Sequence, residues 1–363
     1  MKVAVLGAGA IGLGTAAALL ARGHAVALWS PGGASTAFLR EGRPLVAEGA
    51  VAGSFQPQLA ESAAAAVAGA DAVLIAVPAN GHRRVIDAVV PHLAAGQAVI
   101  ISSHYSLSAL YLSQSLAARG IACPIVAWAT TVTTGRRTAP GSVAVATVRK
   151  EVDLAALPSH DSAATLALCT MLFGERFRVR DDVLAIALSN LNPPSHMANA
   201  LCNLTRIEKG ERWANYDCIT ESVGRLIEAL DRERLAVAAQ FGLAVRSVHE
   251  HMHLSFDVPR GSVAAMAREL HARRGGPPGP TTLEHRYVTE DVPFGLMPLI
   301  AIARAAGVPV PLHEAGVALF SALYGRDFAA ENDLLPALDI ASMSAAALHT
   351  RARDGYAAAR SPG

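Results

Sequence analysis

Cysteine is scarce in this sequence. The chain has 4 cysteines in 363 residues, and none of them shows the Cys-x-x-Cys spacing of a redox or metal motif. Isolated cysteines without such spacing are most simply explained as buried, reduced thiols. We therefore expect no disulfide framework. The four residues are Cys123, Cys169, Cys202 and Cys218.

Charge of either sign is also low. Charged residues make up 17% of the chain, and the formal net charge is +1. Because no basic surplus is available to neutralise phosphates, we expect no nucleic-acid partner. No uncharged apolar run approaches the length of a membrane span, and the first strand begins at residue 2 with no signal peptide before it. We therefore expect a cytoplasmic protein that does not bind membranes.

A glycine pattern follows the first predicted strand. Val3–Leu6 leads directly into a G-x-G-x-x-G sequence, a helix is predicted over Leu13–Arg22, and a second strand over Ala25–Trp29. In such a βαβ unit the first glycine makes a tight turn, the second leaves room for phosphates, and the third lets the helix pack closely. The helix N-terminus adds free N–H donors. This predicts a dinucleotide site made of Gly7, Gly9, Ala10, Ile11 and Gly12, with Ser30, Val77 and Pro78 at neighbouring strand ends.

No acidic residue ends the second strand. NAD-specific sites carry Asp or Glu about 20 residues beyond the glycines, where it binds the ribose 2′-hydroxyl. Here the strand ends in Leu28-Trp29-Ser30-Pro31-Gly32-Gly33. Without a carboxylate a 2′-phosphate is not repelled, and Ser30 and the loop amides can donate hydrogen bonds to it. Arg40 is the nearest cation in sequence. The pattern favours NADP, with NAD as the alternative.

The hydrophobic pattern changes character half-way along the chain. Hydrophobic residues make up 52% of a chain that is too long for one ordinary core. Strands, among them Ser142–Val148, alternate with helices as far as about residue 175, which predicts a mostly parallel sheet covered on both faces. From Asp181 onward the apolar spacing is mostly helical, and the last helix is predicted over Leu335–Ala347. We predict a Rossmann-type α/β domain over residues 1–180 and an all-α domain over 181–363. The last residues, from Ala357, are expected to fray, and the apolar helical domain offers a surface for a homodimer.

Two segments of the second half carry chemically useful side chains. In Asn192-Pro193-Pro194-Ser195-His196, Asn192 can cap a helix and Pro193 fits its first position, which puts His196 in the first turn. The positive end of the helix there suits a histidine that gives and takes a proton. A histidine at a helix start with no catalytic role explains the position alone more simply.

The second segment is His285–Leu296. It places Arg286, Glu290 and Asp291 within six residues, in a stretch that Pro293 is expected to keep extended. Arginine grips carboxylates bidentately, and a carboxylate such as Asp291 can hold a histidine ring nitrogen and fix its tautomer. A solvated loop with local ion pairs explains the same residues equally well.

A third motif, His249-Glu250-His251-Met252-His253, fits the H-E-x-x-H pattern of zinc proteases. No third ligand is evident in the sequence, and a fold built for a dinucleotide needs no zinc. We therefore expect no metal.

At these residues the chain resembles the opine dehydrogenases, of the octopine and nopaline dehydrogenase type. The resemblance runs nearly the full length, and the R-x-x-x-E-D-V-P-x-G-L sequence of Arg286–Leu296 is its most specific part; Met197 stands where the family pattern has a proline. The resemblance implies an NAD(P)H-dependent enzyme that condenses an amino acid with a 2-oxo acid and reduces the imine. It implies His196 as general acid and base, oriented by Asp291, with Arg286 anchoring a carboxylate.

Further substrate-binding candidates are Asn192 and Arg136, the latter in a loop predicted over Thr130–Ala139. One alternative is a 2-oxo or 2-hydroxy acid reductase of the ketopantoate reductase or glycerol-3-phosphate dehydrogenase type. Those families place a catalytic lysine near the start of the helical domain, whereas the lysines here are Lys2, Lys150 and Lys209. An alternative of another class is a non-catalytic NADP-binding sensor.

Overall fold

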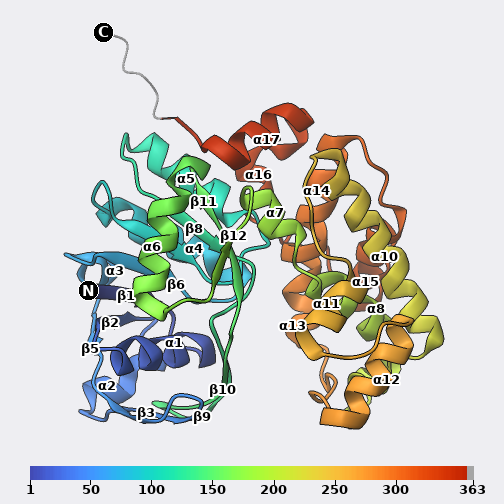
Figure 1. Ribbon diagram of the computed structural model, residues 1–363, viewed down its shortest axis with the longest axis horizontal. Helices are drawn as coiled ribbons and strands as arrows, with labels where there is room; N and C mark the ends of the chain where they lie inside the picture. Colours follow the sequence, from blue (N-terminus) through green and yellow to red (C-terminus); the bar gives the residue numbers. More distant parts are fainter. Residues whose placement is uncertain (358–363) are drawn as a thin grey trace. The chain divides into compact units, whose positions relative to one another are not determined.

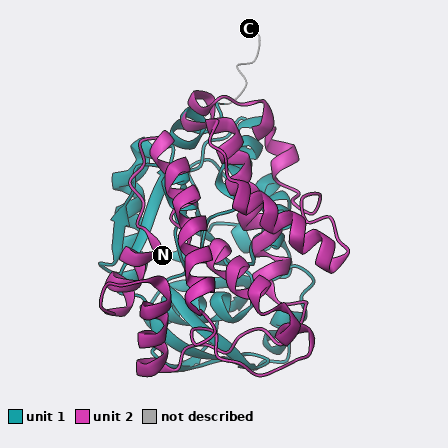
Figure 2. Cartoon of the chain, turned by 90° about the vertical axis from the view of Figure 1, so that its right-hand side faces the viewer, with its two compact units in different colours: residues 1–187, 350–363 teal, residues 188–349 magenta. Residues whose placement is uncertain are grey.

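The computed structural model describes residues 1–357, so the segment expected to fray, from Ala357 to the end, lies outside the described residues except for Ala357. The chain forms two compact units, coloured separately in Figure 2. Unit 1 comprises residues 1–187 and the chain from Thr350 onward, and unit 2 comprises residues 188–349. A domain over residues 181–363 would include the C-terminal segment in the helical unit. The segment from Thr350 onward belongs instead to unit 1. It packs on unit 1, where the Tyr356 amide donates to Ser113 Oγ at 2.9 Å.

Unit 1 is built on an eight-stranded sheet in the order β12-β11-β8-β7-β6-β1-β2-β5. All neighbouring strands run parallel except β8 and β11. Apolar runs such as Val3–Leu6 are fully buried, as a parallel sheet covered on both faces requires. The strands are β1 (Lys2–Leu6), β2 (Ala25–Trp29), β5 (Gln58–Leu59), β6 (Ala72–Ile75), β7 (Ala98–Ile101), β8 (Ile125–Trp128), β11 (Val152–Leu157) and β12 (Phe177–Val179).

A second sheet of four strands, in the order β4-β3-β10-β9, was not predicted. The segment Ser142–Val148 was expected in the parallel sheet but forms β10, which pairs antiparallel with β9 and parallel with β3. In β10, Val143 and Val145 are buried and their neighbours are not. This alternation is typical of a strand in a sheet with one solvent-exposed face. The strands are β3 (Leu45–Gly49), β4 (Gly53–Phe55), β9 (Thr133–Ala139) and β10 (Ser142–Val148).

Helices cover both faces of the main sheet (Figure 1). On one face α3 contacts α4 and α4 contacts α5, while α1 contacts α6 and the second sheet on the other. Trp128 at the end of β8 packs edge-on against Phe173 of α6, with ring centroids 5.4 Å apart. The helices are α1 (Ala10–Ala21), α2 (Ala37–Arg40), α3 (Ala63–Val67), α4 (His82–Val89), α5 (Ser108–Ala118), α6 (Ser162–Phe173) and α7 (Val183–Leu188).

Unit 2 is helical, which confirms the expected α/β domain followed by an all-α domain. One predicted helix, Leu335–Ala347, is wrong: Asp339 adopts a left-handed backbone, with φ 50°, that a right-handed helix cannot contain. The helices are α8 (Asn192–Cys202), α9 (Leu204–Glu208), α10 (Glu221–Gln240), α11 (Val248–Phe256), α12 (Val263–Arg274), α13 (Arg286–Thr289), the π-helical turn η5 (Val292–Leu296), α14 (Met297–Ala306), α15 (Pro311–Tyr324), α16 (Leu335–Leu338) and α17 (Ala345–Asp354), of which α17 passes into unit 1 at Thr350.

The four cysteines are all unbridged, but only two of them are buried. Cys123 and Cys169 lie in the core, as expected. Cys202, the last residue of α8, is exposed, and Cys218 is half-buried with its sulfur accepting a hydrogen bond from Arg206 at 3.1 Å. Within residues 1–357, no helix has both the length and the apolarity needed to cross a bilayer.

Candidate active site

The glycine turn after β1 has the geometry that a dinucleotide phosphate site requires. Gly7 has φ +120°, and a Cβ there would collide with the Ala76 backbone, while a Cβ on Gly12 would collide with the Gly7 carbonyl oxygen. At Gly9, in contrast, a Cβ would meet no atom within 4 Å. Two glycines are therefore needed for packing, and the middle one faces open space. The residues present fit a bound pyrophosphate.

The neighbouring cofactor candidates lie at the same edge of the sheet. Ala10 and Ile11 are the first two residues of α1, for which Gly9 is the N-cap. Because β6 runs parallel beside β1, Val77 follows the same strand edge, and its side chain lies against Gly7. Pro78 comes next in the chain. The structure thus gathers these predicted residues around one turn at the carboxyl ends of β1 and β6.

The chain after β2 carries the two residues considered for a 2′-phosphate, Ser30 in the loop and Arg40 in α2. Ser30 is half-buried, and its carbonyl accepts from the Gly33 amide at 3.0 Å. The Arg40 guanidinium lies against this loop, since a Cβ on Gly33 would be 3.2 Å from its Nη1. Arg40 also forms an ion pair with Glu61, with Nε 3.2 Å from both carboxylate oxygens. This pairing raises the pKa of Arg40, and it brings the Glu61 carboxylate beside the guanidinium.

In unit 2, the structure joins two of the residues singled out in the sequence. His196 Nδ1 lies 2.6 Å from Asp291 Oδ2. The side chain of Asp291 is 1% exposed and that of His196 is 16% exposed. An ionised carboxylate can only accept, so the proton of this hydrogen bond sits on Nδ1. His196 is carried by α8 and Asp291 directly precedes η5, two elements that pack against each other.

The start of α8 differs from the predicted capping. The helix begins at Asn192, so Asn192 is not its N-cap, and its amide instead donates to Asn190 Oδ1 at 2.9 Å. His196 is therefore the fifth helical residue and lies beyond the first turn. The following Met197 is buried against Gly316 of α15, where any Cβ would collide with its side chain.

The segment Arg286–Leu296 is helical and not extended as predicted. It forms α13 and then η5, in which Pro293 occupies an N-terminal position. A proline there removes an N–H that has no partner inside the helix, so it does not prevent the turn. Asn332 binds the Pro293 carbonyl at 2.7 Å. π-Helical turns are rare and occur frequently at functional sites.

The arginine candidates lie in different surroundings. Arg286 in α13 donates through Nε to Glu290 at 3.0 Å; its side chain is 53% exposed, and that of Glu290 is 6% exposed. Arg136 was expected in a loop, but it lies exposed in strand β9, opposite Ala144. The pairing of Thr133–Ala139 with β10 converts the expected loop into a strand. Arg136 therefore belongs to the second sheet of unit 1.

Tyr287 was missed in the sequence. Its ring stacks on the His196 imidazole with centroids 3.5 Å apart and planes inclined by 12°. Its hydroxyl accepts a hydrogen bond from Asn215 at 3.0 Å. Tyr287 directly follows Arg286, but no spacing rule connects it with a histidine 91 positions earlier in the sequence. Only the packing of α13 on α8 reveals the contact.

The H-E-x-x-H residues serve the structure of α11. Ser247 and Glu250 form a capping box at its N-terminus. His249 Nε2 lies 3.3 Å from Glu228, and His253 Nδ1 lies 2.8 Å from the Val258 carbonyl oxygen. Among residues 1–357, no group of three or more His, Cys, Asp or Glu side chains is placed to hold a metal ion.

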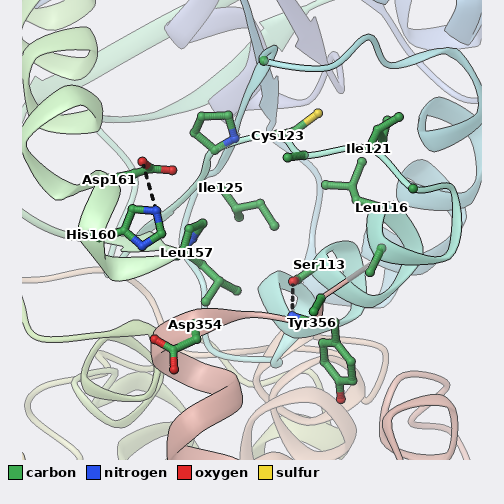
Figure 3. A pocket seen from close by; sticks show the side chains of 17 residues that line it. Ser113, Leu116, Ile121, Cys123, Ile125, Leu157, His160, Asp161, Asp354 and Tyr356 are labelled. Carbon is green, nitrogen blue, oxygen red and sulfur yellow. Dashed lines mark hydrogen bonds and ion pairs between the residues drawn. The ribbon is translucent and has the colours of Figure 1, made fainter. Parts of the chain in front are cut away.

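A cavity of about 550 Å³ lies elsewhere in unit 1 (Figure 3). It is lined by residues at the starts of β7 and β8, including Gly96 and Ile125, and by Tyr356 of the C-terminal segment. Parallel strands begin at one sheet edge and end at the other, so this cavity is at the edge opposite the glycine turn. It is distinct from the predicted cofactor site.

Comparison with known proteins matches one family to the first half of the chain and another to the helical half. A family described as "NAD/NADP octopine/nopaline dehydrogenase, alpha-helical domain" matches residues 179–324, and one described as "Ketopantoate reductase PanE/ApbA" matches residues 3–158. An opine dehydrogenase from Arthrobacter sp. (strain 1C) is 33% identical over 353 residues, which are 96% of this chain and 97% of that protein. The chain belongs to the opine dehydrogenase family. It is accordingly an NAD(P)-dependent oxidoreductase, and the resemblance noted in the sequence is confirmed.

Solved structures of this family share the fold. A structure of octopine dehydrogenase with NADH and L-arginine has a TM-score of 0.77 at 17% identity and covers 90% of each chain. A structure of yersinopine dehydrogenase with bound NADP+ has a TM-score of 0.73 at 16% identity, with 94% of this chain and 97% of that chain covered. One of these relatives holds NADH and the other NADP+, so a nicotinamide cofactor is supported, without a choice between the two.

Proposed function

We propose that this opine dehydrogenase family member condenses the amino group of an amino acid with the carbonyl of a 2-oxo acid and reduces the imine, with NADPH preferred to NADH. The observation that carries the proposal is the 2.6 Å hydrogen bond between His196 Nδ1 and the buried carboxylate of Asp291. A histidine so held can give and take a proton at its other nitrogen.

The proton chemistry falls to His196. Loss of water from the adduct of amine and carbonyl requires a proton on the leaving oxygen, and Nε2 of the imidazolium supplies it. The Asp291 carboxylate stabilises the imidazolium before the transfer and keeps the neutral ring in the tautomer protonated on Nδ1. Water addition in the reverse direction returns the proton to Nε2.

Substrate carboxylates need a cationic partner. The Arg286 guanidinium is half-exposed and is oriented by Glu290, which is itself buried. Bidentate binding by such a guanidinium places a 2-oxo acid carboxylate in a fixed orientation. Asn192, exposed at the start of α8, and Arg136 in β9 are further proposed contacts for substrate polar groups.

The cofactor would be held by the glycine turn. The pyrophosphate would occupy the open space at Gly9, with the amides of Ala10 and Ile11 as donors, and Val77 and Pro78 beside it. Ser30 and Arg40 would bind a 2′-phosphate. Bound nicotinamide supplies the hydride that reduces the imine.

The test is a cofactor-oxidation assay. We expect NADPH absorbance to fall only when a 2-oxo acid, such as pyruvate, 2-oxoglutarate or glyoxylate, is combined with a member of an amino-acid panel. Oxidation without any amine would instead support the single-substrate reductase. If no pair supports turnover while NADPH still binds, the non-catalytic sensor is supported.

The proposed reaction also predicts opposite pH preferences for its two directions. Reductive condensation consumes a proton, whereas oxidation of the product releases one. The oxidative direction should therefore have its optimum at higher pH than the reductive direction. Initial rates in both directions across a pH series check this, and identical optima would contradict the scheme.

A further inference from the structure

We infer that Tyr287 is a positioning residue that fixes the plane of the His196 imidazole, so that Nε2 points in one direction during proton transfer. The inference rests on the proposed role of His196. A hydrogen bond to Nδ1 restrains one point of the ring but still allows it to rock about that bond. A flat partner on the ring face removes this freedom. Tyr287 provides it, with centroids 3.5 Å apart and planes inclined by 12°.

Tyr287 is itself held by a chain of asparagine side chains. Asn215 donates through Nδ2 to the Tyr287 hydroxyl at 3.0 Å. Asn199 donates through Nδ2 to the backbone carbonyl and the side-chain carbonyl of Asn215, at 3.1 and 3.0 Å. Asn199 and Asn215 are 1% and 6% exposed. Buried hydrogen bonds of this kind are expensive to break, so the tyrosine has little freedom to turn.

This chain of contacts begins and ends on the same helix. Asn199 lies one turn after His196 on α8, and the path returns to His196 through Asn215 and the Tyr287 ring. The backbone of Tyr287 is fixed as well, because its amide donates to His285 Nδ1 at 3.3 Å. These contacts hold the Tyr287 ring in a fixed position relative to α8, the helix that carries His196.

The tyrosine does not exchange the proton itself. Burial raises the pKa of Tyr287 to about 12, so its hydroxyl stays protonated at neutral pH. Burial also lowers the pKa of His285, whose ring packs edge-on against that of Tyr287 with centroids 4.5 Å apart. The aromatic face is the part of Tyr287 that stacks on His196, whereas the hydroxyl is bound by Asn215.

A spectroscopic test separates positioning from general stability. A ring stacked on an imidazole shifts its carbon-bound protons upfield, and His196 signals are identified in the ¹H–¹³C spectrum of the full chain by their loss in His196→Gln. Tyr287→Leu should abolish the upfield shift, whereas Tyr287→Phe should keep most of it, because it retains the ring and loses only the hydrogen bond from Asn215. Tyr324→Leu is the matched control, because Tyr324 is a partly buried tyrosine of unit 2 whose ring packs on Phe320 and Phe328.

The same variants are expected to change kcat. In Tyr287→Leu, kcat should fall roughly 10- to 100-fold, the size of effect produced by a small misplacement of a catalytic group, with KM for NADPH unchanged. Tyr287→Phe should retain most of kcat. If Tyr287→Leu does not fold, Asn215→Ala carries the test: it keeps the ring and removes the same hydrogen bond that Tyr287→Phe removes, so it should reduce the upfield shift and kcat in part, to a similar extent as Tyr287→Phe.

An unchanged His196 shift in Tyr287→Leu, or equal losses of kcat in the Phe and Leu variants, would overturn the inference. The shift is measured without turnover. A shift that behaves as expected in a protein that turns over no substrate pair would reject the proposed function and leave the positioning role intact.

Discussion

A histidine beside a carboxylate occurs repeatedly in unit 2, and the surroundings of each pair decide what it can do. His313 pairs with Glu233 at 2.7 Å, but its side chain is completely buried, and Glu233 also caps the start of α15. His249 is 38% exposed and meets Glu228 through Nε2 at 3.3 Å. His196 combines a fully buried partner on Nδ1 with partial exposure of its own ring. This combination suits a proton-transfer group.

Replacement of Asp291 tests this distinction. In Asp291→Asn, we expect kcat to fall by roughly 10² to 10⁴, because the imidazolium loses its counter-charge and the tautomer is no longer fixed. NADPH affinity, measured by fluorescence titration, should not change. The matched control is Glu228→Gln, which alters another histidine–carboxylate pair of unit 2 and should leave kcat near that of the unmodified enzyme. Equal losses in both variants would argue against the dyad.

A single substitution at Arg40 tests the proposed preference for NADPH over NADH. Arg40→Gln should raise KM for NADPH roughly tenfold or more while KM for NADH stays constant, because only NADPH carries the 2′-phosphate. Arg43→Gln is the control: Arg43 is a nearby exposed arginine paired with Glu41 at 2.8 Å. A parallel rise for both cofactors would show that Arg40 acts on the loop structure and not on the phosphate.

At the scale of elements, the glycines of the turn between β1 and α1 have two different roles. Gly12 is required for packing, whereas Gly9 faces the space proposed for the cofactor phosphates. Gly9→Ala should leave the melting temperature unchanged, because its Cβ meets no atom within 4 Å. The same Cβ should abolish cofactor binding by filling the phosphate space. Gly12→Ala should lower the melting temperature as well, because its Cβ strikes the Gly7 backbone. Thermal melts and NADPH titrations check both variants, and a stable Gly9→Ala that binds NADPH normally would refute the phosphate site.

Sequence alone predicted the elements whose signals are local. The strand, turn and helix around Gly7 depend on residues within one βαβ unit, and the pattern was sufficient there. The second sheet was missed because β3 pairs with β10, about a hundred residues later in the chain. The helical form of Arg286–Thr289 and η5 was missed because Pro293 was read as a helix breaker, although proline is tolerated at the start of a turn.

The same limit applies to the candidate site. His196 and Asp291 were found through short motifs, but the stacking partner Tyr287 and its supporting asparagines have no common spacing. Tyr287 and Asn215 meet only because the loop after α9 packs against α13. Motifs therefore indicate which groups do chemistry, whereas tertiary packing decides which residues hold them in place.

At the scale of the whole molecule, a buried histidine makes stability depend on pH. His104 is fully buried after β7, and its Nε2 accepts from the Ala109 amide at 3.2 Å. Burial lowers its pKa to about 3. An unfolded chain binds a proton there near pH 6.5, so the unfolded state holds more protons between about pH 6.5 and 3. Above about pH 6.5, neutral His104 makes its full contribution to the free energy of unfolding. This contribution is lost as the pH falls from about 6.5 toward 3.

Urea denaturation at pH 7.5 and pH 5 measures this effect. The free energy of unfolding should decrease on acidification by up to about 1.4 kcal/mol per pH unit from this one group. In His104→Gln, which keeps an acceptor for the Ala109 amide, that part of the slope should disappear. His160→Gln, at a side chain 79% exposed, should retain it. The same slope in both variants would mean that other groups cause the pH dependence.

The return of the chain to unit 1 near Thr350 affects how the protein is made. Unit 2 is an insertion, because unit 1 contributes residues on both sides of it in the sequence. The bond from Tyr356 to Ser113 joins positions 243 residues apart. During synthesis, the helical unit has all its residues before the first unit has received its last segment. Synthesis of unit 1 thus begins before that of unit 2 and continues after it, and a chain released just before Thr350 would carry a complete unit 2 and an incomplete unit 1.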